Sequence, residues 1–293
     1  MNEALAQNKF FKAWRITERV TRITGLAMEC CYLIEGEERA LLIDGLTGVG
    51  SLRAFVRELT ELPVTAALTH AHMDHSGIAW ESDSVYLHPD DLFLLYSDTD
   101  QSREQRLDFV NLFRRMGIPG RTTPKLADVL EQHPVRTFPI YDGDHIALGG
   151  VTVEVIAVPG HTRGTVVFLD RRDRIVFSGD ACNANTLLNL TGSTSIAEYR
   201  EGLLHLKSFE DAYDEMWAGH DYTALPKKIV DDGIALCERI LARTDDAIET
   251  EDAFGGKSLL AAARSEGFRT KCGSLCNIVY KPETICKSVR PIL

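Results

Sequence analysis

The segment from Thr69 to His75 constrains the fold and the chemistry of this chain more than any other part of its 293 residues. It reads T-H-A-H-M-D-H, so that three histidines and one carboxylate fall within six positions. Packing alone gives no reason for such a cluster. Divalent first-row metals such as zinc or iron, in contrast, take neutral imidazoles and carboxylate oxygens as ligands. The sequence therefore predicts a metal site in this segment.

The cluster follows an apolar run, Val64 to Leu68, which predicts a buried strand. Alternate side chains of an extended chain lie on the same side, so His70 and His72 would point together. Asp74 and His75 would follow a turn and could face a neighbouring point. The spacing suits either one metal ion or two, and two ions require further ligands.

Three later segments each bring a ligand-type side chain directly after an apolar run and a glycine. They read V-P-G-H, F-S-G-D and W-A-G-H, and they end at His161, Asp180 and His220. A glycine before the ligand lets the backbone turn sharply, so that the side chain projects from the end of a strand. Each segment alone could be an ordinary polar turn. Together with the histidine cluster, the three predict one shared metal site.

In this order of motifs the chain resembles the metallo-beta-lactamase superfamily of metallohydrolases over roughly residues 13 to 225. The resemblance implies two metal sites and one bridging ligand: His70, His72 and His161 for the first ion, Asp74, His75 and His220 for the second, and Asp180 between them. It implies two zinc ions per chain, with iron or manganese as other candidates. The most familiar β-lactamases carry Cys where Asp180 stands, so the chain is closer to the glyoxalase II, lactonase and phosphodiesterase branches. Cys182 is expected to be a small buried residue beside the site.

The resemblance implies hydrolysis. Two divalent ions about 3.5–4 Å apart can lower the pKa of a shared water from about 15.7 to near 7. We therefore expect a hydrolase that uses a dinuclear-zinc-bound hydroxide to open an ester, thioester, lactone or amide bond of a small molecule. Asp180 and Asp74 are the expected catalytic residues, the latter for proton transfer as well as ligation. Asn183 and Tyr222 flank ligand positions and are the expected substrate-binding residues. Three hydroxyl side chains could orient the imidazoles or make only local turn hydrogen bonds: Thr69, Thr162 and Ser178.

Other functions stay open at this point. A mononuclear iron dioxygenase acting on persulfides resembles the same signature, and a small-molecule phosphodiesterase or a non-catalytic metal-binding sensor would also use these ligands. The formal net charge of −11 would repel an extended phosphate backbone, so no nucleic-acid partner is expected. Small phosphoesters are not excluded, because two metal ions can neutralise a phosphate without a basic patch.

Length and pattern favour one α+β domain over residues 1–293, with the four-layer αββα sandwich that the resemblance implies. Apolar runs predict strands over 14–16, 20–23, 30–35 and 40–43, followed by a helix that Ser51 opens. Residues from 89 to about 133 carry apolar side chains at helical spacing and predict a helical insertion. It could cover the site as a cap that selects the substrate, or pack against the edge of the sandwich.

The segment from about 226 to 293 predicts a C-terminal helical appendage, which could shape the pocket or form the surface of a homodimer. A helix is expected from Pro226 through Ala242, a second over 258–265 and a strand over 277–280. No apolar stretch approaches the roughly 18–20 residues that span a bilayer, and residues 1–13 lack a hydrophobic signal segment, so a cytoplasmic enzyme without a membrane partner is expected. The seven cysteines are expected to be free thiols. Cys272, Cys276 and Cys286 match no usual zinc motif and are expected to be buried near a terminal strand.

Overall fold

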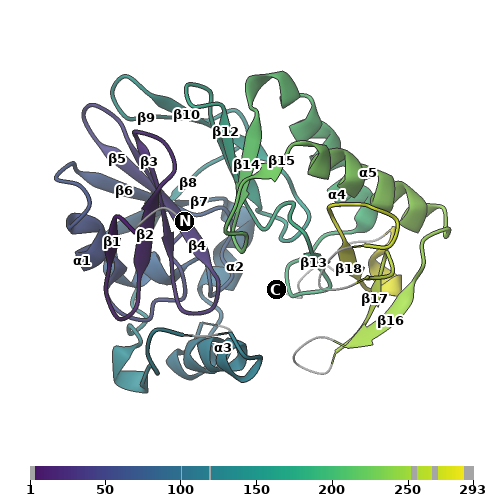
Figure 1. Cartoon of the computed structure of the whole chain (residues 1–293), viewed down its shortest axis with the longest axis horizontal. Helices are drawn as coiled ribbons and strands as arrows, with labels where there is room; N and C mark the ends of the chain where they lie inside the picture. The colour runs from purple at the N-terminus through teal and green to yellow at the C-terminus, as the bar shows by residue number, and fades with distance from the viewer. Residues whose placement is uncertain (1–3, 100, 119, 252–255, 266–269, 287–293) are drawn as a thin grey trace. The chain divides into compact units, whose positions relative to one another are not determined.

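The computed structural model describes residues 4–99, 101–118, 120–251, 256–265 and 270–286 (Figure 1). The chain divides into two compact units, Met1–Val155 and Ile156–Leu293. The division falls inside one strand, β10 (Thr152–Ala157). Both units mix strands with a few helices, which confirms the predicted α+β class.

An eight-stranded sheet, whose strands follow one another in sequence order, forms the centre of the first unit. Its strands from β1 to β5 pair antiparallel as a meander, and those from β5 to β8 pair parallel. Its members are β1 (Ala6–Gln7), β2 (Lys12–Arg15), β3 (Val20–Thr24), β4 (Cys30–Glu35), β5 (Ala40–Ile43), β6 (Val64–Ala67), β7 (Ser84–Leu87) and β8 (Arg136–Pro139). The four strands predicted before residue 44 and the strand before the histidine cluster are confirmed.

Short helices connect the parallel strands of this sheet, as parallel pairing requires. Between β5 and β6 lies α1 (Leu52–Arg57), which begins where predicted because the Ser51 hydroxyl accepts a hydrogen bond from the Ala54 N–H at 3.1 Å. The 3-10 helix η1 (Gly77–Glu81) follows the histidine cluster. Leu52, Phe55 and Val56 bury the inner face of α1 in the core of the unit.

The described residues of the predicted insertion, 89–133, include four helical segments between β7 and β8. They are η2 (Pro89–Asp91), α2 (Leu92–Leu95), α3 (Arg103–Arg115) and η3 (Leu126–Asp128). The Ser102 hydroxyl caps α3 by accepting a hydrogen bond from the Gln105 N–H at 3.2 Å. The helical character of the insertion is confirmed, and its role as a cap over the substrate stays a prediction.

A second sheet has the strand order β15-β14-β12-β11-β10-β9. The first residues of β10, which belong to the first unit, pair antiparallel with β9. A smaller sheet has the order β13-β18-β17-β16. Two helices, α4 and α5, pack side by side (Figure 1). The bounds are β9 (His145–Ala147), β11 (Val166–Asp170), β12 (Ile175–Gly179), β13 (Thr186–Leu188), α4 (Ile196–Lys207), η4 (Glu210–Ala212), β14 (Glu215–Ala218), β15 (Leu225–Pro226), α5 (Lys228–Leu241), β16 (Ile248–Glu251), β17 (Lys257–Leu260), β18 (Ile278–Tyr280) and η5 (Pro282–Thr284).

Helix α4 begins with a capping box. The Ser195 hydroxyl accepts a hydrogen bond from the Glu198 N–H at 3.2 Å, and the Ser195 N–H donates back to the Glu198 carboxylate at 3.1 Å. Partial burial by itself would raise the pKa of Glu198, but these hydrogen bonds and the nearby Arg163 guanidinium hold it below its usual value. The carboxylate therefore stabilises this helix end in its ionised form.

The C-terminal region corrects part of the prediction. The expected helix over 226–242 is confirmed as α5, which begins at Lys228 because Pro226 pairs with β14 as part of β15, and the expected strand over 277–280 is confirmed as β18. The expected helix over 258–265 is wrong, because residues 257–260 form β17 between β16 and β18. The run S-L-L-A-A-A suits a helix locally, but Ser258 and Leu260 point into the unit with strand alternation, and the pairing with two strands prevails.

Two of the three C-terminal cysteines also differ from expectation. Cys276 is buried, whereas Cys272 and Cys286 are exposed. Cys182 is buried as expected and packs in the core of the second unit.

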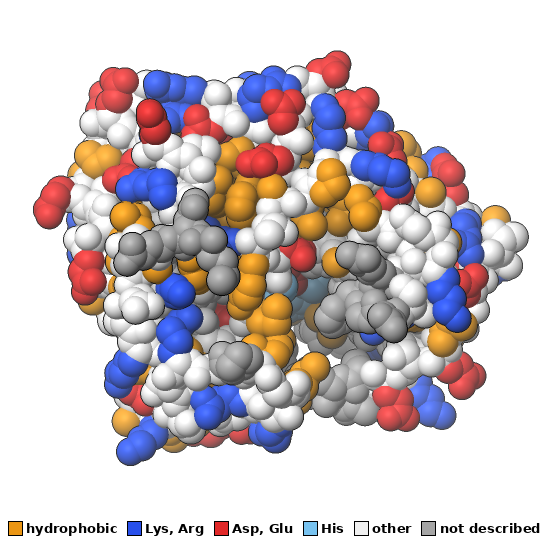
Figure 2. All heavy atoms as spheres, in the orientation of Figure 1, with side chains coloured by type: hydrophobic (Ala, Val, Ile, Leu, Met, Phe, Trp, Pro, Cys, Tyr) orange, Lys and Arg blue, Asp and Glu red, His pale blue; other side chains and the backbone are white. Residues whose placement is uncertain are grey.

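Acidic and basic side chains are interspersed on the face of the molecule drawn in Figure 2. In the described part of the chain, no helix combines the length and the apolar character needed to cross a membrane.

Candidate metal centre

The first unit holds the histidine cluster in a loop, residues 69–76, that we call the metal loop. It follows β6, which pairs parallel with β5, so the ends of both strands lie at one edge of the sheet. Asp44, directly after β5, donates its N–H to the Ala67 carbonyl at 2.9 Å and so lies beside the start of the metal loop. Its backbone adopts a φ of 63°, a left-handed conformation that aspartate tolerates better than most residues.

The Asp44 carboxylate, which is buried, organises this loop. It accepts hydrogen bonds from the Thr69 N–H at 2.7 Å, from the Thr69 hydroxyl at 2.8 Å and from His75 Nδ1 at 2.9 Å. Because the Thr69 hydroxyl donates to Asp44, it accepts from His70 Nδ1, which lies 3.0 Å away. Both imidazoles thus carry their proton on Nδ1, and the lone pair of each Nε2 is the one that can bind a metal.

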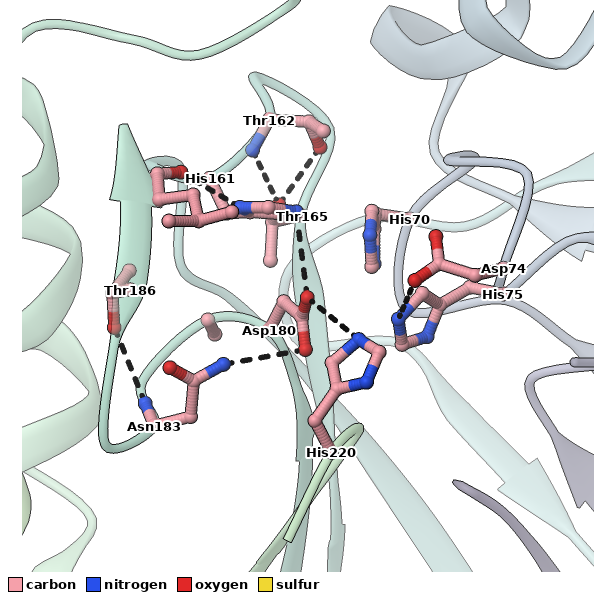
Figure 3. A network of polar contacts seen from close by, with 12 residues as sticks. His70, Asp74, His75, His161, Thr162, Thr165, Asp180, Asn183, Thr186 and His220 are labelled. Atoms are coloured by element: carbon pink, nitrogen blue, oxygen red, sulfur yellow. Dashed lines mark hydrogen bonds and ion pairs between the residues drawn. The ribbon is translucent and has the colours of Figure 1, made fainter. Parts of the chain in front are cut away.

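Two further ligand-type side chains lie in the same loop. Asp74 lies in a turn over residues 73–75, and its Oδ2 is 3.8 Å from His75 Nε2 (Figure 3). The rings of His70 and His72 meet edge to face with centroids 4.9 Å apart. The four predicted ligands of this segment are therefore gathered within the first unit.

Strand ends also position the predicted ligands in the second unit. β12 and β14 pair parallel, and the Gly219 N–H donates to the Gly179 carbonyl at 2.8 Å, so Asp180 and His220 leave the same edge of the sheet. Gly179 has a φ of 49°, which supplies the sharp turn that the sequence predicts. Gly160 is needed for space instead, because a Cβ there would lie 2.1 Å from Tyr199.

The carboxylate of Asp180 lies between two imidazoles of this unit (Figure 3). Its Oδ2 is 3.7 Å from His161 Nε2 and 3.4 Å from His220 Nε2. His161 Nδ1 lies 2.8 Å from the Leu187 carbonyl, which can only accept, so this ring also carries its proton on Nδ1. The Asn183 amide donates to Asp180 Oδ1 at 3.3 Å, and the Asn183 N–H in turn donates to the Thr186 hydroxyl at 3.2 Å.

These distances fit a divalent metal. When His161 is neutral, its proton on Nδ1 leaves a lone pair at Nε2, and that lone pair faces a carboxylate oxygen 3.7 Å away. Two acceptors in this arrangement repel each other unless a cation lies between them. Ligand bonds of about 2.0–2.1 Å in tetrahedral geometry place neighbouring ligand atoms about 3.3–3.4 Å apart. The separation of 3.4 Å at His220 matches that value, and the other two are slightly wider.

Two carboxyl groups beside the ligands have raised pKa values. Burial raises the pKa of Glu29, the negative charge of Asp74 adds to the effect, and hydrogen bonds from Thr47 and the Ala27 N–H oppose it. Burial also raises the pKa of Asp221, where His220 opposes and Asp180 adds to the shift. Burial is the main cause of both shifts, and the carboxylates of Asp74 and Asp180 add to them.

The remaining predicted residues fall in different places. Thr69 contacts His70 and so has the predicted orienting position, whereas the Thr162 hydroxyl lies 2.7 Å from that of Thr165 in a local turn. Asn183 is buried against Asp180, and Tyr222 is exposed. Their roles in substrate binding stay predictions.

Asp44 was not predicted from the sequence. It follows an apolar strand as Asp180 does, but its place beside the metal loop depends on the parallel pairing of β5 with β6.

Comparisons with known proteins find a matching family and several relatives. A sequence model of the metallo-beta-lactamase superfamily matches residues 28–213. The uncharacterized protein Rv2581c of Mycobacterium tuberculosis is 32% identical over 171 residues, which are 53% of this chain and 68% of that protein. The human acyl-coenzyme A thioesterase MBLAC2 is 28% identical over 182 residues, 57% of this chain and 63% of that protein. Hydroxyacylglutathione hydrolase GloC of Haemophilus influenzae is 23% identical over 167 residues, 54% of this chain and 68% of that protein.

Solved structures share the fold. A metallo-beta-lactamase from Pontibacter korlensis matches with a TM-score of 0.56 at 16% identity, covering 78% of this chain and 99% of that one. This likeness confirms the predicted fold class. The matched part spans less than two thirds of the human thioesterase.

Proposed function

The chain belongs to the metallo-beta-lactamase superfamily, and from that premise we propose that it is a metal-dependent thioesterase acting on small acyl thioesters. The superfamily and its relatives are hydrolases and imply a divalent metal. Two relatives that differ in their acyl carrier, coenzyme A in one and glutathione in the other, are both named for cleavage of a thioester. That shared bond, rather than either carrier, is what we carry over to this chain.

The proposed metal centre uses all seven ligand-type residues. His70, His72 and His161 would hold one zinc ion, Asp74, His75 and His220 would hold a second, and Asp180 would bridge the two. Three observations support this assignment: the order of the motifs, the Nδ1 protonation of His70, His75 and His161, and the ligand-atom separations of 3.4–3.8 Å within each unit. The proton on Nδ1 of each ring is the strongest of these observations, because it leaves the Nε2 lone pair available to bind a metal ion.

Bound metal would lower the pKa of a water molecule toward neutrality and polarise the thioester carbonyl. The water oxygen would bond to the carbonyl carbon, the carbon–sulfur bond would break, and a carboxylate and a thiol would leave. Asp180 would hold its position because Asn183 donates to its Oδ1, which leaves Oδ2 directed at the two imidazoles. The Asp74 carboxylate would accept a proton released from the attacking water.

The test is thioester hydrolysis by protein that has been stripped of metal and reloaded with zinc. Acetyl-CoA and lactoylglutathione serve as the two substrates, and the loss of thioester absorbance reports turnover. This readout avoids thiol reagents, which would also react with the exposed Cys272 and Cys286. We expect turnover that depends on zinc and disappears in His72→Ala, while His145→Ala, a histidine exposed on β9, keeps the wild-type rate.

Absence of zinc-dependent turnover on both carriers, in protein that binds two zinc ions, would reject the thioesterase proposal. Oxygen uptake with a persulfide donor, in protein that retains one iron ion, would favour the dioxygenase alternative instead.

A further inference from the structure

The insertion contacts the metal loop through two buried side chains. Both the N–H and the carbonyl of Ala71 are bound by them: the N–H donates to Asp91 Oδ2 at 3.2 Å, and the carbonyl accepts from Gln101 Nε2 at 2.8 Å. Ala71 lies between His70 and His72. Ala71 therefore joins two proposed ligands of the first metal ion, and side chains of the insertion bind both of its backbone polar groups.

Gln101 reaches the other end of the metal loop as well. Its Oε1 accepts a hydrogen bond from the Ser76 hydroxyl at 3.1 Å, directly after His75. One amide group thus spans the loop from Ala71 to Ser76, using its donor at one end and its acceptor at the other. Asp91, Gln101 and Ser76 are fully buried, so water does not compete for these hydrogen bonds.

Gln101 is itself fixed by the first turn of α3. The guanidinium of Arg106, also fully buried, donates from Nε to the Gln101 carbonyl at 3.0 Å. It donates in addition to the Thr47 and Leu130 carbonyls. Burial, with a smaller contribution from Arg103, lowers the pKa of Arg106 to about 10, so it stays charged at neutral pH and keeps all three hydrogen bonds. The backbone of Gln101 is therefore held in place independently of the metal loop.

We propose that the insertion is a brace for the metal loop, in which Gln101 and Asp91 are positioning residues for metal binding. The inference rests on the proposed metal centre. Neither side chain is expected to touch a metal ion or a substrate. Their effect is to fix the Ala71 peptide, and with it the directions in which His70 and His72 leave the backbone.

Loss of the brace has a defined consequence. Without the Gln101 amide, the buried Ala71 carbonyl and the Ser76 hydroxyl must find other partners, and rotation of the Ala71 peptide is the nearest way to do so. That rotation moves the side chain of His72. Removal of groups that orient metal ligands typically lowers metal affinity by about 10- to 100-fold, and we expect a loss of this size in Gln101→Ala.

The test compares zinc affinity in three Gln variants and the wild type. Affinity is measured by competition with a chromophoric chelator, and the geometry of the site by the visible absorption of the cobalt-substituted protein. Gln101→Ala removes both hydrogen bonds. Gln101→Glu keeps the shape and the acceptor for Ser76 but replaces the donor to Ala71. Gln105→Ala is the matched control, since it changes the same residue type at a partly exposed position on α3. Asp91→Ala, with the exposed Asp90→Ala as its control, tests the second contact.

The brace predicts that Gln101→Ala and Gln101→Glu both bind zinc about 10- to 100-fold more weakly than Gln105→Ala and show altered cobalt bands. Wild-type zinc affinity and cobalt spectrum in both Gln101 variants would overturn it, even if their metal-free forms unfold at lower temperature, because that result describes a purely structural role. If Gln101→Ala does not fold, the isosteric Gln101→Glu decides. Failure of the wild type to bind zinc would instead overturn the proposed metal centre on which the brace depends.

Discussion

Replacing Asp44 with asparagine is expected to weaken metal binding through the protonation state of His75. The carboxylate accepts from the Thr69 N–H at 2.7 Å with one oxygen and from His75 Nδ1 at 2.9 Å with the other. An asparagine in the same place offers one oxygen and one NH₂ group. In either orientation of the asparagine amide, its NH₂ group faces a donor, either the Thr69 N–H or the His75 Nδ1–H.

Both outcomes carry a cost that can be worked out. If the NH₂ group faces His75, the ring must move its proton to Nε2 in order to accept at Nδ1, and a protonated Nε2 cannot bind metal. If the NH₂ group faces Thr69, a buried N–H loses its partner, which costs about 1–3 kcal/mol. We therefore expect zinc at the site of His75 to bind about 10- to 100-fold more weakly. The metal-free protein is expected to lose about 1–3 kcal/mol of unfolding free energy.

Zinc affinity of Asp44→Asn is measured by chelator competition at pH 7, and unfolding free energy by urea titration of the metal-free protein. Asp83→Asn is the control, because Asp83 is an exposed carboxylate of the same unit. Binding of two zinc ions by Asp44→Asn with wild-type affinity would show that Asp44 does not set the tautomer of His75.

Other perturbations test the proposed ligands, the cap of α4, the contact at Gly160 and the bound metal. Asp180→Asn and His72→Ala are expected to abolish zinc-dependent thioester hydrolysis, with circular dichroism spectra that match the wild type; residual turnover near the wild-type rate would contradict the assignment of either ligand. Glu198→Gln removes a carboxylate whose pKa in the folded protein lies below its usual value of 4.5, so its stabilisation is full above about pH 4.5 and is lost as the pH falls through the lower value. The difference in unfolding free energy between wild type and variant is expected to be about 0.5–1 kcal/mol at pH 7, because the group is partly exposed, and to vanish at low pH in urea titrations. Gly160→Ala places a Cβ 2.1 Å from Tyr199 and is expected to cost about 1–3 kcal/mol of stability, measured in the same way; an unchanged midpoint would show that the contact relaxes freely. Zinc at about 100 times its dissociation constant is expected to stabilise the protein by about 2.7 kcal/mol, and addition of a chelator should lower the thermal midpoint accordingly.

Local signals in the sequence were enough to predict which backbone elements carry the proposed ligands. The apolar runs before His161, Asp180 and His220 end as strands where expected, and Gly179 adopts the left-handed turn that its position suggested. Such features depend on a few neighbouring residues. The helix that Ser51 opens was predictable for the same reason, since its cap and its apolar spacing lie within one turn.

Features that depend on long-range pairing could not be predicted. Asp44 matters only because β5 and β6 pair parallel, which brings it beside a loop 25 residues later. Gln101 lies in a polar segment before α3 and gives no local sign that its amide reaches Ala71, 30 residues earlier. The helix predicted over 258–265 is wrong for the same reason, because the start of this run pairs as β17 with β16 and β18.

The most direct test of the central claim is a zinc titration of metal-free protein, with metal bound per chain and thioester hydrolysis measured in the same samples. Two zinc ions are expected to bind per chain, and turnover of at least one of the two thioesters is expected to rise with their binding. Turnover that is unchanged after complete metal removal, or two bound zinc ions without cleavage of either thioester, would contradict it.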